Sequence, residues 1–230
     1  MNNRKKKYYL FEIDVVILNV LCTIIILVLF LMTYLFAKDF ILGIFDNIDM
    51  SWFIIFYLIY MILHEVLHSI GYVLYGGDFK KIIYGIQLES GVFYCLCKQN
   101  VTRKNILNSL LFPLFYLGII TYILSFVFNS YYLLILSIFN IAGSVGDIMM
   151  FLYIVKLNRG IEYTELDNAI QFAIYSDVDV SKYSHFGLIY KGVADVVSRD
   201  DLKKIRISKI SYILLILIVI WCILFGMLPK

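Results

Sequence analysis

The chain has 230 residues, of which 62% are hydrophobic and only 16% are charged, and its mean hydropathy is +0.86. Soluble domains have roughly 45–50% apolar and about 25% charged residues, so this composition argues against a water-soluble fold. The formal net charge of +3 is small, and no segment resembles a nucleic-acid-binding surface. We therefore expect the chain to lie in a lipid bilayer.

Apolar runs long enough to cross a bilayer follow a short basic segment, residues 1–14. A transmembrane helix needs about 20 predominantly apolar residues. The runs that meet this criterion are, in chain order, residues 15–36, 52–75, 106–128, 131–157 and 210–228. The first run follows charged residues and has no small-residue cleavage site, which predicts an anchor rather than a cleaved signal peptide. Pro113 in the third run predicts a kink in that helix.

The polar connections predict two smaller units. In the loop 79–104, the β-rich runs 82–87 and 92–97 flank residues 88–91, which predicts a short hairpin. Residues 158–208 mix acidic, basic and aromatic side chains, which predicts a small subdomain rather than disorder. The predicted fold is therefore an all-α polytopic membrane protein: a core at 15–157, the hairpin, the subdomain and a fifth transmembrane helix at 209–230.

The distribution of Lys and Arg predicts the orientation. Eighteen of the 20 basic residues lie before the first span, between the second and third, or from the end of the fourth to the start of the fifth, leaving only Lys38 and Lys230 on the other side. Cytoplasmic loops are enriched in Lys and Arg, so the hairpin, the subdomain and the amino terminus are predicted to be cytoplasmic. The predicted location is a cell membrane that the chain crosses several times.

The second span contains the motif His64-Glu65-Val66-Leu67-His68. Histidines at i and i+4 share one face of a helix, where both imidazoles can bind one zinc ion and the intervening glutamate can act on water. Ionisable groups inside a span are costly unless a partner compensates them, and a metal ion is such a partner. The alternative is a trio of polar residues that form hydrogen bonds within a helical bundle.

Catalytic zinc usually takes three protein ligands, and Asp147 is the only acidic residue in the third, fourth or fifth span. At 1.5 Å per residue, the two histidines lie roughly 18–24 Å below the outer end of their span, and Asp147 lies at about the same depth. The predicted zinc ligands are therefore His64, His68 and Asp147. A carboxylate that only forms a hydrogen bond to a neighbouring helix remains the alternative for Asp147.

The helix with this motif, the β-rich segment after it and a later span with a glycine-flanked Asp resemble site-2 protease type intramembrane metalloproteases. The likeness is greatest to the Putative zincin peptidase family of small bacterial membrane proteins and covers roughly residues 51–157. It implies zinc at His64, His68 and Asp147 and cleavage of transmembrane or membrane-associated polypeptides. The chain departs from the site-2 pattern in lacking prolines before the aspartate and in having Gly146 before Asp147, although Asn140 is present.

The predicted mechanism is zinc-assisted hydrolysis of a peptide bond near the cytoplasmic side, with Glu65 as general base and Asn140 as a candidate oxyanion or substrate contact. The hairpin either pairs with an extended substrate or only covers the bundle. Cys95 and Cys97 either contribute to a metal site or are ordinary strand residues, and His185 is expected at the surface. The rival functions are a transporter that retains a metal site and a catalytically silent scaffold or immunity-type protein.

Overall fold

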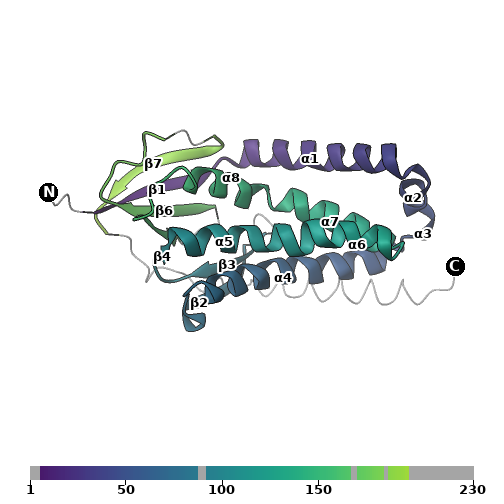
Figure 1. Cartoon of the computed structure of the whole chain (residues 1–230), viewed down its shortest axis with the longest axis horizontal. Coiled ribbons are helices and arrows are strands. Elements are labelled where there is room, and N and C mark those ends of the chain that lie inside the picture. Colours follow the sequence, from purple (N-terminus) through teal and green to yellow (C-terminus); the bar gives the residue numbers. More distant parts are fainter. Residues whose placement is uncertain (1–5, 88–91, 167–169, 184–185, 197–230) are drawn as a thin grey trace.

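The computed structural model describes residues 6–87, 92–166, 170–183 and 186–196. Helices run along the long axis of the molecule, and a β-sheet lies at one end of them (Figure 1). The predicted fifth span and His185 fall outside the described residues, as does the loop 88–91 of the hairpin.

Three helices in the described residues are long and apolar enough to cross a membrane. They are α1 (Val15–Phe36), α4 (Met50–Leu74) and the continuous helix Arg103–Val127, which consists of α5 (Arg103–Pro113), a π-helical segment (Leu114–Ile120) and α6 (Thr121–Val127). A fourth span is formed if α7 (Tyr131–Gly143) and α8 (Val145–Ile154), which are bent by 41°, are counted together. The short helices α2 (Lys38–Leu42) and α3 (Ile44–Asn47) connect α1 to α4 at the end opposite the sheet (Figure 1).

The bend between α7 and α8 has a local cause at Ser144. Its hydroxyl donates to the backbone carbonyl of Asn140, one turn earlier, at 2.9 Å. Side-chain bonds of this type often bend helices. The predicted fourth span is therefore two helices that meet at an angle.

Aspartate side chains define where two of the spans begin. The Asp14 carboxylate accepts the backbone N–H groups of Val16 and Ile17, and Asp49 caps α4 in the same way. Such caps satisfy N–H groups that have no partner within the helix. Both helix starts are therefore fixed by local sequence.

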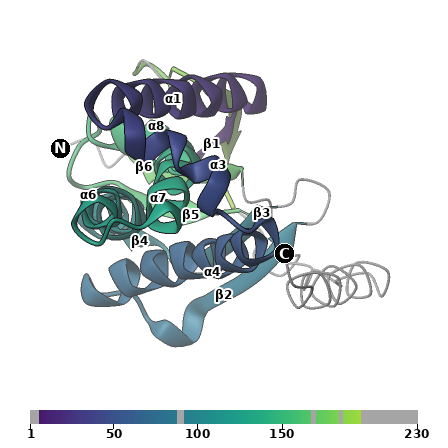
Figure 2. The ribbon, with the colours of Figure 1, turned by 90° about the vertical axis from the view of Figure 1, so that its right-hand side faces the viewer.

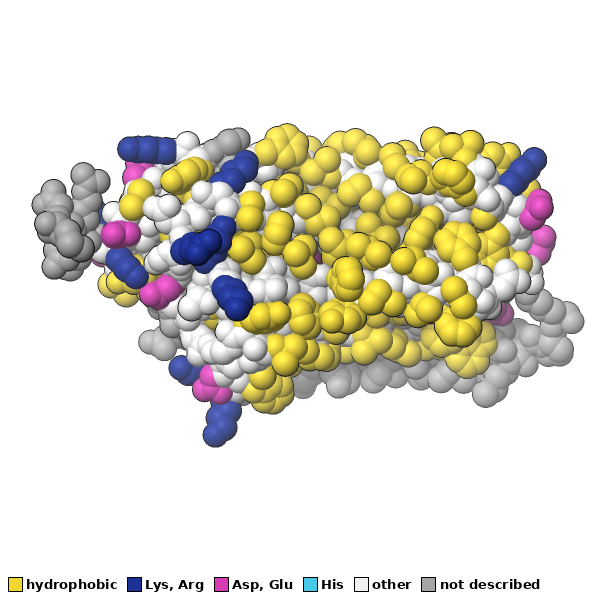
Figure 3. Space-filling view, viewed as in Figure 1, with side chains coloured by type: hydrophobic (Ala, Val, Ile, Leu, Met, Phe, Trp, Pro, Cys, Tyr) yellow, Lys and Arg dark blue, Asp and Glu magenta, His cyan; other side chains and the backbone are white. Residues whose placement is uncertain are grey.

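The helices expose an apolar belt. No residue in the most apolar window of α1 is buried, and the exposed fractions reach 63% at Leu27 and 69% at Leu35. In the space-filling view, hydrophobic side chains cover the helices and charged side chains collect at both ends (Figure 3). Exposed apolar surface of this extent is unfavourable in water and suits a bilayer.

The sheet shows that the prediction of an all-α fold is wrong. It is antiparallel, with strand order β4-β5-β6-β1-β7. The strands are β1 (Lys7–Ile13), β4 (Val101–Thr102), β5 (Glu162–Glu165), β6 (Gln171–Ser176) and β7 (Leu188–Ala194). Alternating Tyr9, Phe11 and Ile13 point into the core, as a half-buried strand requires. The segment predicted only as a basic arm thus contains a strand of this sheet.

The predicted hairpin strands are confirmed. A 3₁₀ turn (Phe79–Lys81) leads into β2 (Ile82–Gln87), which pairs antiparallel with β3 (Val92–Cys97) from Ile82↔Cys97 to Gln87↔Val92. Seen along the helices, α1 and α4 lie on opposite sides of α6 and α7, and the hairpin lies beside α4 (Figure 2). This arrangement brings β3 next to the H-E-x-x-H helix.

The main core joins the sheet to the adjacent ends of the helices. Phe11 of β1, Phe172 of β6 and Tyr153 of α8 belong to one buried cluster. Within the bundle, α4 and α5 approach closely, because a Cβ added at Gly71 would lie 2.6 Å from Ser109 Cα. This close approach brings the backbone of α5 to the histidines of α4.

Candidate metal site

The side chains of the H-E-x-x-H motif lie together on one face of α4. The possible ligand atoms of His64, Glu65 and His68 are all within 4.8 Å of one another. Asp147, in the first turn of α8, points its carboxylate at both histidines. The bent fourth span thus places an acidic side chain opposite the two imidazoles.

The distances among three of these groups fit one zinc ion. His64 Nε2 and His68 Nε2 are 3.1 Å apart, and Asp147 Oδ2 lies 3.3 Å and 3.4 Å from them. Ligands about 2.0–2.1 Å from a tetrahedral zinc ion are separated from one another by roughly 3.3 Å. The three atoms therefore have the spacing of three corners of a zinc tetrahedron.

The outer nitrogens of both imidazoles are held by hydrogen-bond acceptors. His64 Nδ1 is 2.9 Å from Asn140 Oδ1, and His68 Nδ1 is 3.0 Å from the backbone carbonyl of Ser109. The Asn140 amide is oriented by its Nδ2, which donates to the Pro113 carbonyl at 3.1 Å. Protons on both Nδ1 atoms leave lone pairs on both Nε2 atoms. Three acceptors then converge, and this arrangement suits a metal cation bound among them.

Pro113 explains why the Ser109 carbonyl is available. In a regular helix this carbonyl would accept the N–H of residue 113, but proline has no N–H. The carbonyl instead faces His68. The π-helical segment that follows Pro113 is a feature often found at functional sites. The proline predicted as a simple kink therefore also exposes a partner for a histidine.

Glu65 faces the hairpin. Its carboxylate accepts a hydrogen bond from the Cys95 backbone, and the Cys97 backbone N–H donates to Glu165 at 2.6 Å. Residues two apart on a strand direct their N–H groups to the same edge. The edge of β3 that faces away from β2 therefore faces the site.

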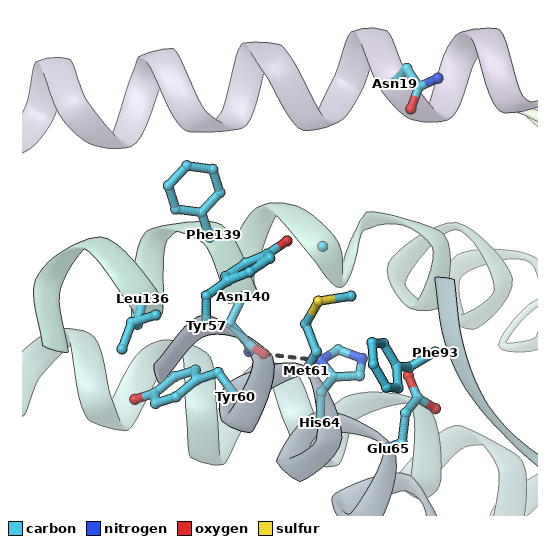
Figure 4. A pocket seen from close by; sticks show the side chains of 11 residues that line it. Asn19, Tyr57, Tyr60, Met61, His64, Glu65, Phe93, Leu136, Phe139 and Asn140 are labelled. Atoms are coloured by element: carbon cyan, nitrogen blue, oxygen red, sulfur yellow. Dashed lines mark hydrogen bonds between the residues drawn. The ribbon is translucent and has the colours of Figure 1, made fainter. Parts of the chain in front are cut away.

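Two cavities meet at the metal-site residues. The larger, of about 370 Å³, lies among α1, α4 and α7 and includes Asn19, Tyr57, Phe139 and Asn140 in its lining. Figure 4 shows Asn19 on α1 across this cavity from the His64–Asn140 hydrogen bond. The smaller cavity, of about 210 Å³, lies between the site and the sheet. His64, Glu65, Phe93 and Gly143 line both cavities.

Glu165 is a site residue that sequence reasoning missed. It belongs to the segment predicted only as a subdomain, and it lines the smaller cavity. Burial raises the pKa of its carboxyl group to about 7, although hydrogen bonds from Tyr72 and the Cys97 backbone lower it. A glutamate held by a distant strand has no motif by which to recognise it.

Of the residues predicted from the sequence as metal-site candidates, one group lies together in the structure and the two cysteines form another. His64, His68, Asp147 and Asn140 are brought together, with Glu65 beside them. Cys95 and Cys97 are buried, and burial raises the pKa of the Cys97 thiol to about 11. Across the described part of the chain, no cysteine joins a group of three or more metal-binding side chains.

Taken together, the helix with two histidines, its glutamate and the converging acceptors define a zincin-type site. Residues 57–161 match the family described as "Putative zincin peptidase", and this match indicates a zinc metallopeptidase. The matched range includes the H-E-x-x-H part of α4, the hairpin and α8, whereas α1 and strands β1, β5, β6 and β7 lie outside it. No curated protein and no solved structure matches the chain.

Proposed function

We propose that the chain is an intramembrane zinc metallopeptidase that hydrolyses peptide bonds of membrane-associated polypeptides near the cytoplasmic side. The observation that carries this proposal is the triangle of His64 Nε2, His68 Nε2 and Asp147 Oδ2, with sides of 3.1, 3.3 and 3.4 Å. It lies inside helices that are apolar enough to cross a bilayer. A soluble metallopeptidase would not need the apolar belt.

The protein groups have distinct roles in this mechanism. His64, His68 and Asp147 hold the ion, and Asn140 and the Ser109 carbonyl keep the histidines oriented. When bound, zinc supplies a Lewis acid that polarises the scissile carbonyl and lowers the pKa of water to about 7. Glu65 removes a proton from the attacking water and returns it to the leaving amine nitrogen. The Cys95 backbone N–H orients the Glu65 carboxylate for both transfers.

The substrate has to be extended at the cleavage point, because a helical peptide bond is shielded by its own hydrogen bonds. On the edge of β3 that faces the site, the N–H groups of Cys95 and Cys97 are taken by Glu65 and Glu165. Pairing with an extended segment is therefore proposed at Phe93, the residue of this edge that lines both cavities. The 370 Å³ cavity beside α1 would receive the part of the substrate that remains in the membrane. The sheet end is the cytoplasmic end in this proposal, because most Lys and Arg flank it.

Glu65→Gln tests the proposal, because the amide keeps the shape of the side chain but cannot act as the base. The purified full chain, loaded with zinc in lipid nanodiscs, would be incubated with a mixture of single-span membrane polypeptides, and products would be detected by mass spectrometry. We expect cleavage to fall by a factor on the order of 10²–10⁴, while zinc content stays stoichiometric.

Asp78→Asn is the matched control, because Asp78 caps a 3₁₀ turn outside both cavities. It should cleave as the wild type does. Cleavage by Glu65→Gln at the wild-type rate would refute the mechanism. Absence of zinc from the wild-type protein after reconstitution would refute the metal site itself.

A further inference from the structure

The smaller cavity has one wall made by the metal-site residues and another made by the sheet. His64, Glu65, His68 and Asp147 form the first wall, and the sheet contributes Tyr163, Glu165 and Phe172 to the second. Its volume of about 210 Å³ is below the roughly 300–1,000 Å³ of typical small-molecule pockets, so it suits one side chain rather than a whole ligand.

Glu165 is fixed in this cavity with acceptor capacity left over. Tyr72 Oη donates to Oε1 at 2.5 Å, and the Cys97 N–H donates to Oε2 at 2.6 Å. A carboxylate has about four acceptor positions, so two donors orient the group without saturating it. Among the described residues, no Lys or Arg lines this cavity. A carboxylate in this position therefore favours a cation brought in by a ligand.

The rest of the lining is suited to an aliphatic stem. Tyr72, Tyr163 and Phe172 are almost fully buried, and they line the same cavity as Glu165. Lys and Arg combine an apolar stem with a cationic head, and aromatic faces also attract cations. An acidic side chain would instead face Glu165 with the same charge.

We propose that this cavity is a specificity subsite for a Lys or Arg side chain of the substrate, next to the scissile bond on its cytoplasmic flank, with Glu165 as the residue that recognises the cation. This proposal rests on the proposed peptidase function. It agrees with the composition of membrane polypeptides, whose cytoplasmic flanks are enriched in Lys and Arg.

The test uses two probes that differ only in the cation. The two probes are Nα-acetyl-lysine hydroxamate and Nα-acetyl-norleucine hydroxamate. Both chelate zinc through the hydroxamate, and the lysine probe adds a terminal ammonium group. Their dissociation constants would be measured on the zinc-loaded full chain in nanodiscs. Because a charge-assisted bond in a closed site contributes strongly, we expect the lysine probe to bind roughly 10- to 100-fold more tightly.

Glu165→Gln should reduce this preference to near unity while zinc content is unchanged. The amide can retain the packing, since its oxygen can accept the Cys97 N–H and its NH₂ group can donate to Tyr72 Oη. Glu162→Gln is the matched control, because Glu162 lies three residues earlier on β5, contacts Lys6 and Asn100, and lines neither cavity. It should keep the wild-type preference.

The outcomes separate this inference from the function on which it rests. Equal affinity of the two probes for the wild-type protein would overturn the subsite and leave the zinc peptidase intact. A preference that persists in Glu165→Gln would overturn the role of Glu165. Failure of both probes to bind zinc-loaded protein would instead contradict the metallopeptidase proposal. If Glu165→Gln does not fold, the ratio of the two dissociation constants for the wild-type protein decides whether the subsite exists.

Discussion

Asn140 allows a sharp test, because its position supports a different role from the oxyanion contact predicted from sequence. Its Oδ1 accepts from His64 Nδ1 at 2.9 Å, and its Nδ2 donates to the Pro113 carbonyl at 3.1 Å. The residue is only 9% exposed, so water cannot easily replace these bonds. We therefore expect Asn140 to act through His64, by fixing the ring and its tautomer.

Two substitutions distinguish the roles. Asn140→Leu removes the acceptor, and loss of such a partner typically lowers metal affinity 10- to 100-fold, or about 1.4–2.7 kcal/mol. Asn140→Asp keeps an acceptor for His64, although it adds a negative charge and replaces the donor to the Pro113 carbonyl with an oxygen. Its zinc affinity should therefore stay closer to that of the wild type than the affinity of Asn140→Leu does. Asn108→Leu is the control, because Asn108 is half-buried, lines neither cavity and donates to the Lys104 carbonyl of its own helix.

Zinc affinity would be measured by competition with a chromophoric chelator on detergent-solubilised protein, together with the rate of substrate cleavage. If Asn140→Leu bound zinc as tightly as the wild type while cleavage was lost, the positioning role would be refuted. That result would return Asn140 to the role of a contact with the oxyanion or substrate.

Three further expectations concern the ligand set, the orientation and the buried glutamate. Asp147→Asn should fold but lose most of its zinc affinity, and full zinc occupancy by this variant would exclude Asp147 as a ligand. Tags at the amino terminus and near Lys203 should be shielded in intact cells while a tag at Lys230 is accessible; labelling of Lys203 from outside would reverse the orientation. Burial in the folded protein raises the pKa of the Glu165 carboxyl from its ordinary value of 4.5 to about 7. The unfolded chain therefore ionises first as pH rises, and the metal-free protein should lose about 3 kcal/mol of stability between about pH 4.5 and pH 7 through this group. Thermal unfolding should show a weaker pH dependence in Glu165→Gln, and parallel curves for variant and wild type would contradict the raised pKa.

Helices and strands were predictable where the residues of the segment itself, or of its immediate neighbour in the chain, determine the structure. The start and end of α1, residues 15–36, follow from a continuous apolar run, and Asp14 caps it with neighbouring N–H groups. The strands 82–87 and 92–97 pair across a short loop, so their partner is adjacent in sequence. The H-E-x-x-H spacing likewise predicts two histidines on one face of a helix, because the geometry of one helical turn is fixed.

The sheet depends on partners far apart in the chain. Residues 7–13 carry three alternating apolar side chains, Tyr9, Phe11 and Ile13, but the lysines before them favoured a basic arm. Their partners are Gln171–Ser176 on one side and Leu188–Ala194 on the other. A single seven-residue strand has little stability by itself. Its pairing becomes stable only when the neighbouring strands β6 and β7 and the core are present.

The sequence alone therefore determined the apolar helices, the hairpin and the motif that holds two histidines and a glutamate, because short-range geometry and hydrophobicity decide them. Only the tertiary structure decided that the Ser109 carbonyl and Glu165 lie at the site. The Ser109 carbonyl reaches His68 because Pro113 lacks an N–H and Gly71 lets α5 approach α4. Glu165 reaches the cavity because β5 pairs between β4 and β6. These placements result from the packing of distant segments, which no local pattern of residues encodes.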